Sequence, residues 1–176
     1  FADGVVAHIT MADPFCPTLS RILAEEAEKI IPEGSQIHKG GTYLAMEGPA
    51  FSTRAESNLY RSWGCNIIGM TNHTEARLAR EAEIAYTSLA MATDYDCWHE
   101  GHGDVTVNMV LENLHANAKV AKQIVTATAK KISHLRPSSD AHTALKNSLM
   151  TSKEMVPDKT RERVNLFTKA YWGDLE

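Results

Sequence analysis

The sequence predicts an α/β fold in which parallel strands are joined by helical crossovers. Short runs of β-branched and apolar residues alternate along the chain with segments whose apolar residues recur at helical spacing. Turns containing glycine or proline separate these segments. The chain has 176 residues, of which 43% are hydrophobic and 23% are charged, and this composition suffices for one hydrophobic core.

The first part of the chain predicts a strand followed by a helix. Residues 5–10 form a β-branched run that is typical of a strand, and a turn region with two prolines comes next. Apolar residues recur at helical spacing over residues 19–31, and Pro32 and Gly34 then end the predicted helix.

Two further predicted strands, residues 40–46 and 66–70, flank a well-marked helix. Thr53, followed three residues later by Glu56, fits a capping box in which the threonine is the N-cap. Gly64 ends this helix, because glycine readily adopts the backbone conformation that follows a helix.

A second crossover helix, residues 75–83, and a third strand, residues 84–93, complete the predicted block. The order strand, helix, strand, helix, strand implies parallel strands. In such sheets, ligands bind beyond the carboxyl ends of the strands. The residues expected to gather at this edge are Phe51, Ser52, Met70, Thr71, Asp94 and Asp96.

The rest of the chain is predicted to be helical. A polar loop, residues 97–104, precedes the longest predicted helix, residues 106–131. Weaker helical patterns occur over residues 141–149 and 159–171. We expect the segment from residue 134 onward to be a peripheral helical tail of the same domain.

Two carboxylates, Asp94 and Asp96, follow the third predicted strand. Residues i and i+2 of a strand point to the same side, about 6–7 Å apart, so these acids would share a face while Tyr95 lies opposite. Proximity of like charges and partial burial raise the pKa of one carboxyl, which can then donate a hydrogen bond. Acids at strand ends also commonly cap turns or face water, so the spacing leaves both interpretations open.

Composition argues against several classes of function. A net charge of −4 provides no basic surface for nucleic acid. No apolar run reaches the roughly 18–20 residues of a membrane span. Cys16, Cys65 and Cys97 are odd in number and far apart, which indicates reduced thiols in a cytoplasmic protein. His99 and His102 lack the i, i+4 spacing of a zinc-protease helix, so we predict no metal site, with a metal-dependent hydrolase as the alternative.

Three sequence blocks carry a resemblance to a known family. They are residues 46–57 (MEGPAFSTRAES), residues 69–72 (GMTN) with Glu75 and Ala76, and residues 90–98 (AMATDYDCW). Together they resemble the 5′-methylthioadenosine phosphorylases of the trimeric purine nucleoside phosphorylase family. The resemblance implies a mixed, twisted sheet flanked by helices, a homotrimer, and phosphorolysis of 5′-methylthioadenosine to adenine and 5-methylthioribose 1-phosphate. Phosphate would be a co-substrate, and no cofactor is implied.

The resemblance also assigns roles to individual residues. Asp94 would be the general acid near the imidazole-ring nitrogen of the purine, and Asp96 would bind the exocyclic amine. Relatives that act on 6-oxopurines carry asparagine at the position of Asp94 and glutamate at that of Ser52, so adenine is favoured here. The other implied site residues are Phe51 and Ser52 at the base, Met70 and Thr71 at the ribose and phosphate, and Val107, Val110 and Leu111 around the methylthio group.

No part of this sequence matches the amino-terminal part of that family, which holds the main phosphate ligands. We therefore expect this chain to be the carboxyl-terminal portion of the enzyme, with an amino-terminal fragment as its partner. Residues 1–133 would be the nucleoside-binding part and residues 134–176 the tail. A 6-oxopurine nucleoside or methylthioinosine phosphorylase and a non-catalytic adenosine-binding subunit remain as alternatives.

Overall fold

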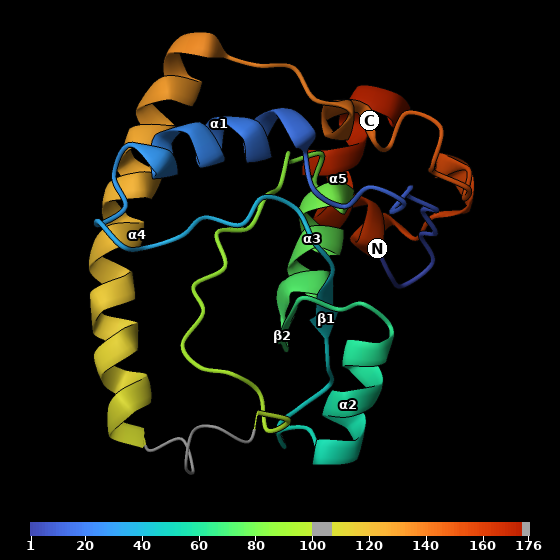
Figure 1. Ribbon diagram of the computed structural model, residues 1–176. Helices are drawn as coiled ribbons and strands as arrows, with labels where there is room; N and C mark the ends of the chain where they lie inside the picture. The colour runs from blue at the N-terminus through green and yellow to red at the C-terminus, as the bar shows by residue number, and fades with distance from the viewer. Residues whose placement is uncertain (100–106, 174–176) are drawn as a thin grey trace. The chain divides into compact units, whose positions relative to one another are not determined.

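The computed structural model describes residues 1–99 and 107–173, and for helical residues 107–110 and 112 it describes the backbone alone (Figure 1). Helices alternate with strands in the first part of the chain, as predicted. The elements are α1 (Pro17–Glu28), β1 (Tyr43–Ala45), α2 (Arg54–Ser62), β2 (Ile67–Gly69), α3 (Asn72–Glu81), α4 (Val107–Leu135) and α5 (Asp158–Trp172), with two short 3₁₀ helices, η1 (Asp140–Thr143) and η2 (Lys153–Met155).

The two strands form a parallel pair, and α2 is the crossover between them. Leu44 lies opposite Ile68 in the register, and Ala45 lies opposite Gly69. The pairing continues beyond the strands, since the backbone N–H of Met46 donates to the carbonyl oxygen of Gly69 at 2.8 Å. The predicted crossover between parallel strands is therefore confirmed for this pair.

Two of the predicted strands are wrong. Residues 5–10 contribute only an isolated antiparallel bridge, between Ala7 and Leu149. Residues 84–93, all of them described, are irregular. A strand exists only where its backbone pairs with a neighbour, and the carbonyls of residues 92 and 93 instead accept hydrogen bonds from the side chains of Asn117 and Asn113.

The predicted helices are largely confirmed. α2 has the predicted capping box, α3 begins at Asn72, three residues earlier than predicted, and α4 continues four residues further, to Leu135. The predicted helix over residues 141–149 is wrong, because that segment holds only η1 followed by turns. Among the described residues, no helix has both the length and the apolar character that a membrane crossing requires.

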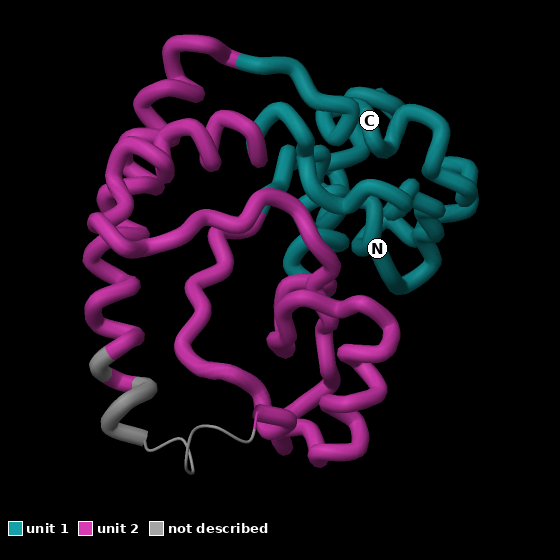
Figure 2. The backbone as a smooth tube through the Cα atoms, in the orientation of Figure 1, with its two compact units in different colours: residues 1–19, 74–87, 137–176 teal, residues 20–73, 88–136 magenta. Residues whose placement is uncertain are grey.

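The chain forms two compact units (Figure 2). The first comprises residues 1–19, 74–87 and 137–176, and its core consists of Val5, Val156 and Val164. Residues from the carboxyl-terminal part therefore pack with residues from the start of the chain. The division between a nucleoside-binding part and a tail from residue 134 stays a prediction.

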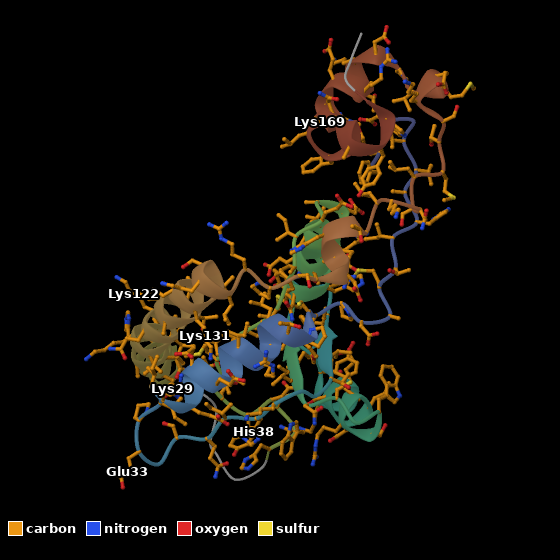
Figure 3. The ribbon with its side chains drawn as sticks, turned by 90° about the horizontal axis from the view of Figure 1, so that it is seen from above. Lys29, Glu33, His38, Lys122, Lys131 and Lys169 are labelled. Atoms are coloured by element: carbon orange, nitrogen blue, oxygen red, sulfur yellow. The ribbon has the colours of Figure 1, made fainter. Side chains whose placement is uncertain are left out.

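The second unit comprises residues 20–73 and 88–136. In it, α1 packs against the carboxyl-terminal half of α4, with Leu23 and Ala27 of α1 buried against Ile124 of α4 (Figure 1). Leu23 and Ala27 are four residues apart, so they lie on one face of α1. Ion pairs line the same junction, and Figure 3 shows two of their lysines, Lys29 and Lys131.

Candidate functional site

The amino terminus of α2 is fixed by a reciprocal capping box. Thr53 Oγ1 accepts a hydrogen bond from the Glu56 backbone N–H at 3.3 Å, and Glu56 Oε2 accepts one from the Thr53 backbone N–H at 2.7 Å. The backbone N–H and the hydroxyl of Thr53 lower the pKa of Glu56, because both stabilise its carboxylate. Phe51 and Ser52 lie immediately before the capping threonine, and Phe51 is 87% exposed.

The loop between β1 and α2 lies against the end of β2. Gly48 has φ +70°, a conformation that favours glycine, and a Cβ there would lie 2.7 Å from Sδ of Met70. In the same loop, the Ser52 hydroxyl donates to Sδ of Met46 at 3.5 Å. Met70 thus lies beside the loop that carries Phe51 and Ser52, as the predicted gathering of strand ends requires.

Asp96 is held at both carboxylate oxygens. The Ser57 hydroxyl of α2 donates to Asp96 Oδ2 at 2.6 Å, and the Cys97 backbone N–H donates to Asp96 Oδ1 at 2.9 Å. Ser57 is 1% exposed, whereas Asp96 is half-buried. An ionised carboxylate has about four lone-pair positions, so Asp96 retains acceptor capacity for a ligand N–H group.

Asp94 has a different environment. It lies at a bend with its side chain exposed, and Oδ1 accepts a hydrogen bond from the Thr93 hydroxyl at 2.5 Å. From α4, Asn113 donates to the Thr93 carbonyl at 2.8 Å and Asn117 to the Ala92 carbonyl at 2.9 Å, so α4 positions the backbone that leads into Asp94. Because residues 84–93 form no strand, the premise that the two acids share a strand face is wrong.

One face of α2 contacts three consecutive residues of the segment that carries Asp96. Arg54 donates to the Cys97 carbonyl, Ser57 donates to Asp96, and the Arg61 guanidinium lies 3.6 Å from the ring centroid of Trp98. The three α2 residues are spaced i, i+3 and i+7, which places them on one side of a helix. The sequence alone did not reveal a role for this stripe of three residues, Arg54, Ser57 and Arg61, although their helical spacing is visible in it.

Beyond Asp96 the chain forms an aromatic cluster. The ring centroids of Tyr95 and His99 lie 4.6 Å apart in a stacked arrangement, and Trp98 meets both rings at steep angles. His102 lies outside the described residues. Within the parts of the chain that are described, no three or more His, Cys, Asp or Glu side chains are grouped so as to hold a metal ion.

The remaining predicted site residues are exposed, or their side chains are not described. Thr71 is exposed, and Leu111 is 45% exposed. The side chains of Val107 and Val110 lie outside the described residues. The contacts above bring Ser52, Met70 and Asp96 to one region through the β1–α2 loop and α2, while the ligand roles of all these residues stay predictions.

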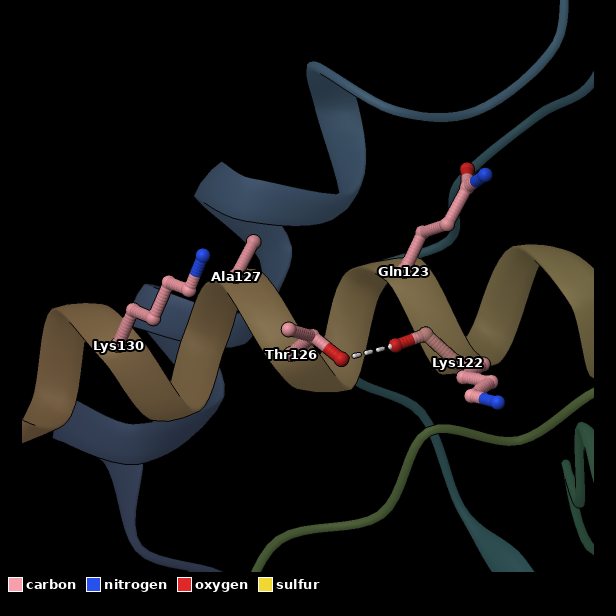
Figure 4. Close-up of a pocket in the computed structure, with 5 residues that line it drawn as sticks. All are labelled: Lys122, Gln123, Thr126, Ala127 and Lys130. Carbon is pink, nitrogen blue, oxygen red and sulfur yellow. Dashed lines mark hydrogen bonds between the residues drawn. The ribbon is translucent and has the colours of Figure 1, made fainter.

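A hollow of about 440 Å³ lies elsewhere, on the surface of α4 (Figure 4). Its lining comes from a single helix: Lys122, Gln123, Thr126, Ala127 and Lys130. Thr126 Oγ1 donates to the carbonyl of Lys122 at 2.7 Å, so its hydroxyl proton is already used. The lining offers no carboxylate and shares no residue with the predicted site, so we place the candidate site beside α2.

Comparisons with known proteins agree on one family. The family described as the Phosphorylase superfamily matches residues 1–130. An S-methyl-5′-thioadenosine phosphorylase of Prochlorococcus marinus is 76% identical over 173 residues, which cover 98% of this chain and 55% of that protein.

Solved structures give the same picture. A methylthioadenosine phosphorylase from an Antarctic soil metagenomic library superposes with a TM-score of 0.89 at 44% identity, over 95% of this chain and 58% of that chain. A methylthioadenosine phosphorylase from Schistosoma mansoni in complex with adenine superposes with a TM-score of 0.68 at 29% identity, over 83% and 57% of the two chains. This chain therefore spans little more than half the length of the proteins that it resembles.

Proposed function

This chain belongs to the phosphorylase superfamily, and we propose that it forms the nucleoside-binding part of an enzyme that cleaves 5′-methylthioadenosine with phosphate. The products would be adenine and 5-methylthioribose 1-phosphate. The observation that carries the proposal is the Asp96 carboxylate, held at both oxygens and placed two residues after Asp94, in a chain 76% identical to an S-methyl-5′-thioadenosine phosphorylase.

Asp96 is the residue proposed to bind the exocyclic amine of the purine. Its oxygens accept hydrogen bonds from Ser57 and from the Cys97 backbone, and the remaining lone pairs suit a third donor. The exocyclic group of adenine is an N–H donor, whereas a 6-oxopurine presents an oxygen that repels a carboxylate. This arrangement supports a preference for adenine over hypoxanthine.

Asp94 is the proposed general acid. As the bond between base and sugar breaks, electron density moves onto the purine, and a protonated Asp94 that donates to the ring nitrogen would stabilise the leaving base. Positioned general acids typically supply about 10²–10⁴-fold in rate. The two asparagines of α4 that hold the carbonyls of residues 92 and 93 support this role, because they restrict the backbone from which Asp94 extends.

The other walls of the proposed site are mainly apolar. Phe51 and Ser52 would contact the base, with Met70 and Thr71 near the ribose and phosphate. Val107, Val110 and Leu111 of α4 would surround the methylthio group. An apolar pocket discriminates between similar groups by only about 1–3 kcal/mol, so we expect some activity on nucleosides with other 5′ groups.

We further propose that phosphate is the co-substrate, that no cofactor takes part, and that an amino-terminal segment completes the site within a homotrimer. The match covers 55% of the Prochlorococcus relative, and the part of that relative outside the match can supply such a segment. We call this chain, produced together with that part, the complete enzyme.

The test compares nucleosides in the presence and absence of phosphate. We expect the complete enzyme to release adenine from methylthioadenosine only when phosphate is present, and faster than it cleaves methylthioinosine or inosine. A preference for inosine would contradict the assignment in favour of a 6-oxopurine phosphorylase. Adenine binding without turnover would instead indicate a non-catalytic binding subunit, and this chain assayed alone is the matched control.

A further inference from the structure

The buried hydroxyl of Ser57 bonds directly to the carboxylate proposed to read the purine amine. We propose that Ser57 is a positioning residue that sets selectivity for 6-aminopurines by orienting Asp96. The inference rests on the proposed function and adds a residue that would not touch the substrate itself.

The contact between Ser57 and Asp96 is short, and its serine end is buried. Ser57 is 1% exposed, and its hydroxyl lies 2.6 Å from Asp96 Oδ2. A serine hydroxyl carries one proton, and an ionised carboxylate can only accept, so this proton is donated to Asp96. The Cys97 backbone N–H donates to the other oxygen at 2.9 Å. Each oxygen of Asp96 therefore accepts one hydrogen bond from the protein, and the ionised carboxylate offers a ligand acceptor positions only.

Neighbouring contacts restrict the backbone on which Asp96 lies. Arg54 and Arg61, three residues before and four residues after Ser57 in α2, hold the Cys97 carbonyl and the Trp98 ring. The capping box fixes the start of the same helix. Of Arg54, Ser57 and Arg61, Ser57 is the one that bonds to the carboxylate group, so together with the Cys97 backbone N–H it restricts rotation of the Asp96 side chain.

Rotation of the carboxylate bears on selectivity more than on the chemical step. A fixed acceptor attracts the amine of methylthioadenosine and repels the carbonyl oxygen of methylthioinosine. Without the Ser57 hydroxyl, the Cys97 backbone N–H alone holds the carboxylate, which is then less restricted, so the attraction and the repulsion both weaken. The signature of this role is a fall in the preference for methylthioadenosine over methylthioinosine, whereas general loosening of the fold would lower both activities alike.

The experiment measures kcat and KM for both nucleosides with the complete enzyme and its Ser57→Ala variant. A hydrogen bond to a charged group typically corresponds to about a 10- to 100-fold effect. We expect kcat/KM for methylthioadenosine to fall by about that factor, mainly through KM, and the value for methylthioinosine to change far less. Ser62→Ala is the control, because Ser62 lies on the same helix and donates to the Leu59 carbonyl rather than to Asp96.

A second variant keeps the test decisive if Ser57→Ala leaves a cavity that unfolds α2. Ser57→Cys retains the packing but donates only a weak hydrogen bond, so it should shift the preference in the same direction with an unchanged unfolding midpoint. An unchanged preference in whichever of these variants is folded overturns the inference. If the unmodified complete enzyme does not cleave methylthioadenosine, the proposed function fails instead, so the two failures are distinguishable.

Discussion

Lys131 Nζ lies 2.7 Å from Glu25 Oε2 and joins α4 to α1 in the second unit. Lys131 also pairs with Glu26 at 3.0 Å, and Lys29 pairs with Glu26 at 2.7 Å. Hydrogen bonds from Lys131, and then from Arg21, lower the pKa of Glu25 to about 2. The same contacts raise the pKa of Lys131, since both carboxylates favour its charged form.

This network predicts a loss of stability in acid. The folded-state pKa of Glu25 is depressed below its ordinary value of 4.5. The contribution of ionised Glu25 to stability is therefore present above pH 4.5 and is lost as the pH falls toward about 2. We expect Lys131→Met to lower the unfolding midpoint above pH 4.5 and to have little effect near pH 2. Thermal unfolding of the chain across this range is the measurement. Lys130→Met is the control, because Lys130 is the neighbouring lysine of α4 and lines the hollow on that helix. An equal fall in the unfolding midpoint of that variant would contradict the prediction.

Gly48 should not tolerate a side chain. Gly48→Ala forces a residue with a Cβ into φ +70°, which costs about 1–2 kcal/mol, and it adds a contact 2.7 Å from the Met70 sulfur. Gly34→Ala is a matched control, because Gly34 has φ +84° but nothing within 4 Å of its Cβ position. We expect Gly48→Ala to reduce the free energy of urea unfolding by more than Gly34→Ala does. Equal losses would mean that Met70 moves aside without cost.

Replacing Asp94 should slow the proposed reaction. With asparagine at this position the complete enzyme lacks a general acid, so we expect turnover of methylthioadenosine to fall by at least about tenfold, the low end of what such an acid supplies. Circular dichroism should show an unchanged fold. Asp140→Asn, at an exposed aspartate of η1, is the control. A rate close to that of the unmodified enzyme would remove Asp94 from the acid role.

The Tyr171 hydroxyl should ionise at a higher pH than an ordinary tyrosine. Its hydroxyl donates to Glu83 Oε1 at 2.5 Å, and this bond to a carboxylate raises the tyrosine pKa from 10.0 to about 12. Because the folded-state pKa is raised, the hydrogen bond between Tyr171 and Glu83 stabilises the folded state fully below pH 10. This stabilisation is lost as the pH rises toward about 12. Ultraviolet titration should show a tyrosine that ionises near pH 12, and Tyr171→Phe should remove that step. Its persistence in the variant would assign it to another tyrosine.

Helix prediction succeeded where the signal is local. The capping box of Thr53 and Glu56 lies within four consecutive residues, and the structure shows both of its hydrogen bonds. The apolar spacing of α1 and α4 likewise depends on neighbours three and four residues apart. Such patterns need no knowledge of the rest of the chain, because a helix pairs its own backbone.

Strand prediction failed where the backbone pairs with no strand among the described residues. Residues 84–93 have a suitable composition, but the hydrogen bonds described for their backbone go to α3, to side chains of α4 and to an irregular segment, as when the Tyr86 carbonyl accepts from the Cys16 N–H at 2.7 Å. The strand argument for Asp94 and Asp96 failed with it. The loop sequences that carry the family likeness nevertheless identified both acids as candidates.

The sequence by itself determined the α-helices α1 to α5, the parallel pair of β1 and β2 with its crossover, and the family, because these depend on local spacing or on short sequence blocks. Only the tertiary structure decided what holds Asp96. Ser57 lies 39 residues before it, and no local pattern pairs a serine on one helix with a carboxylate in a distant loop. That pairing follows from how α2 packs against residues 96–98, and packing is a property of the folded chain.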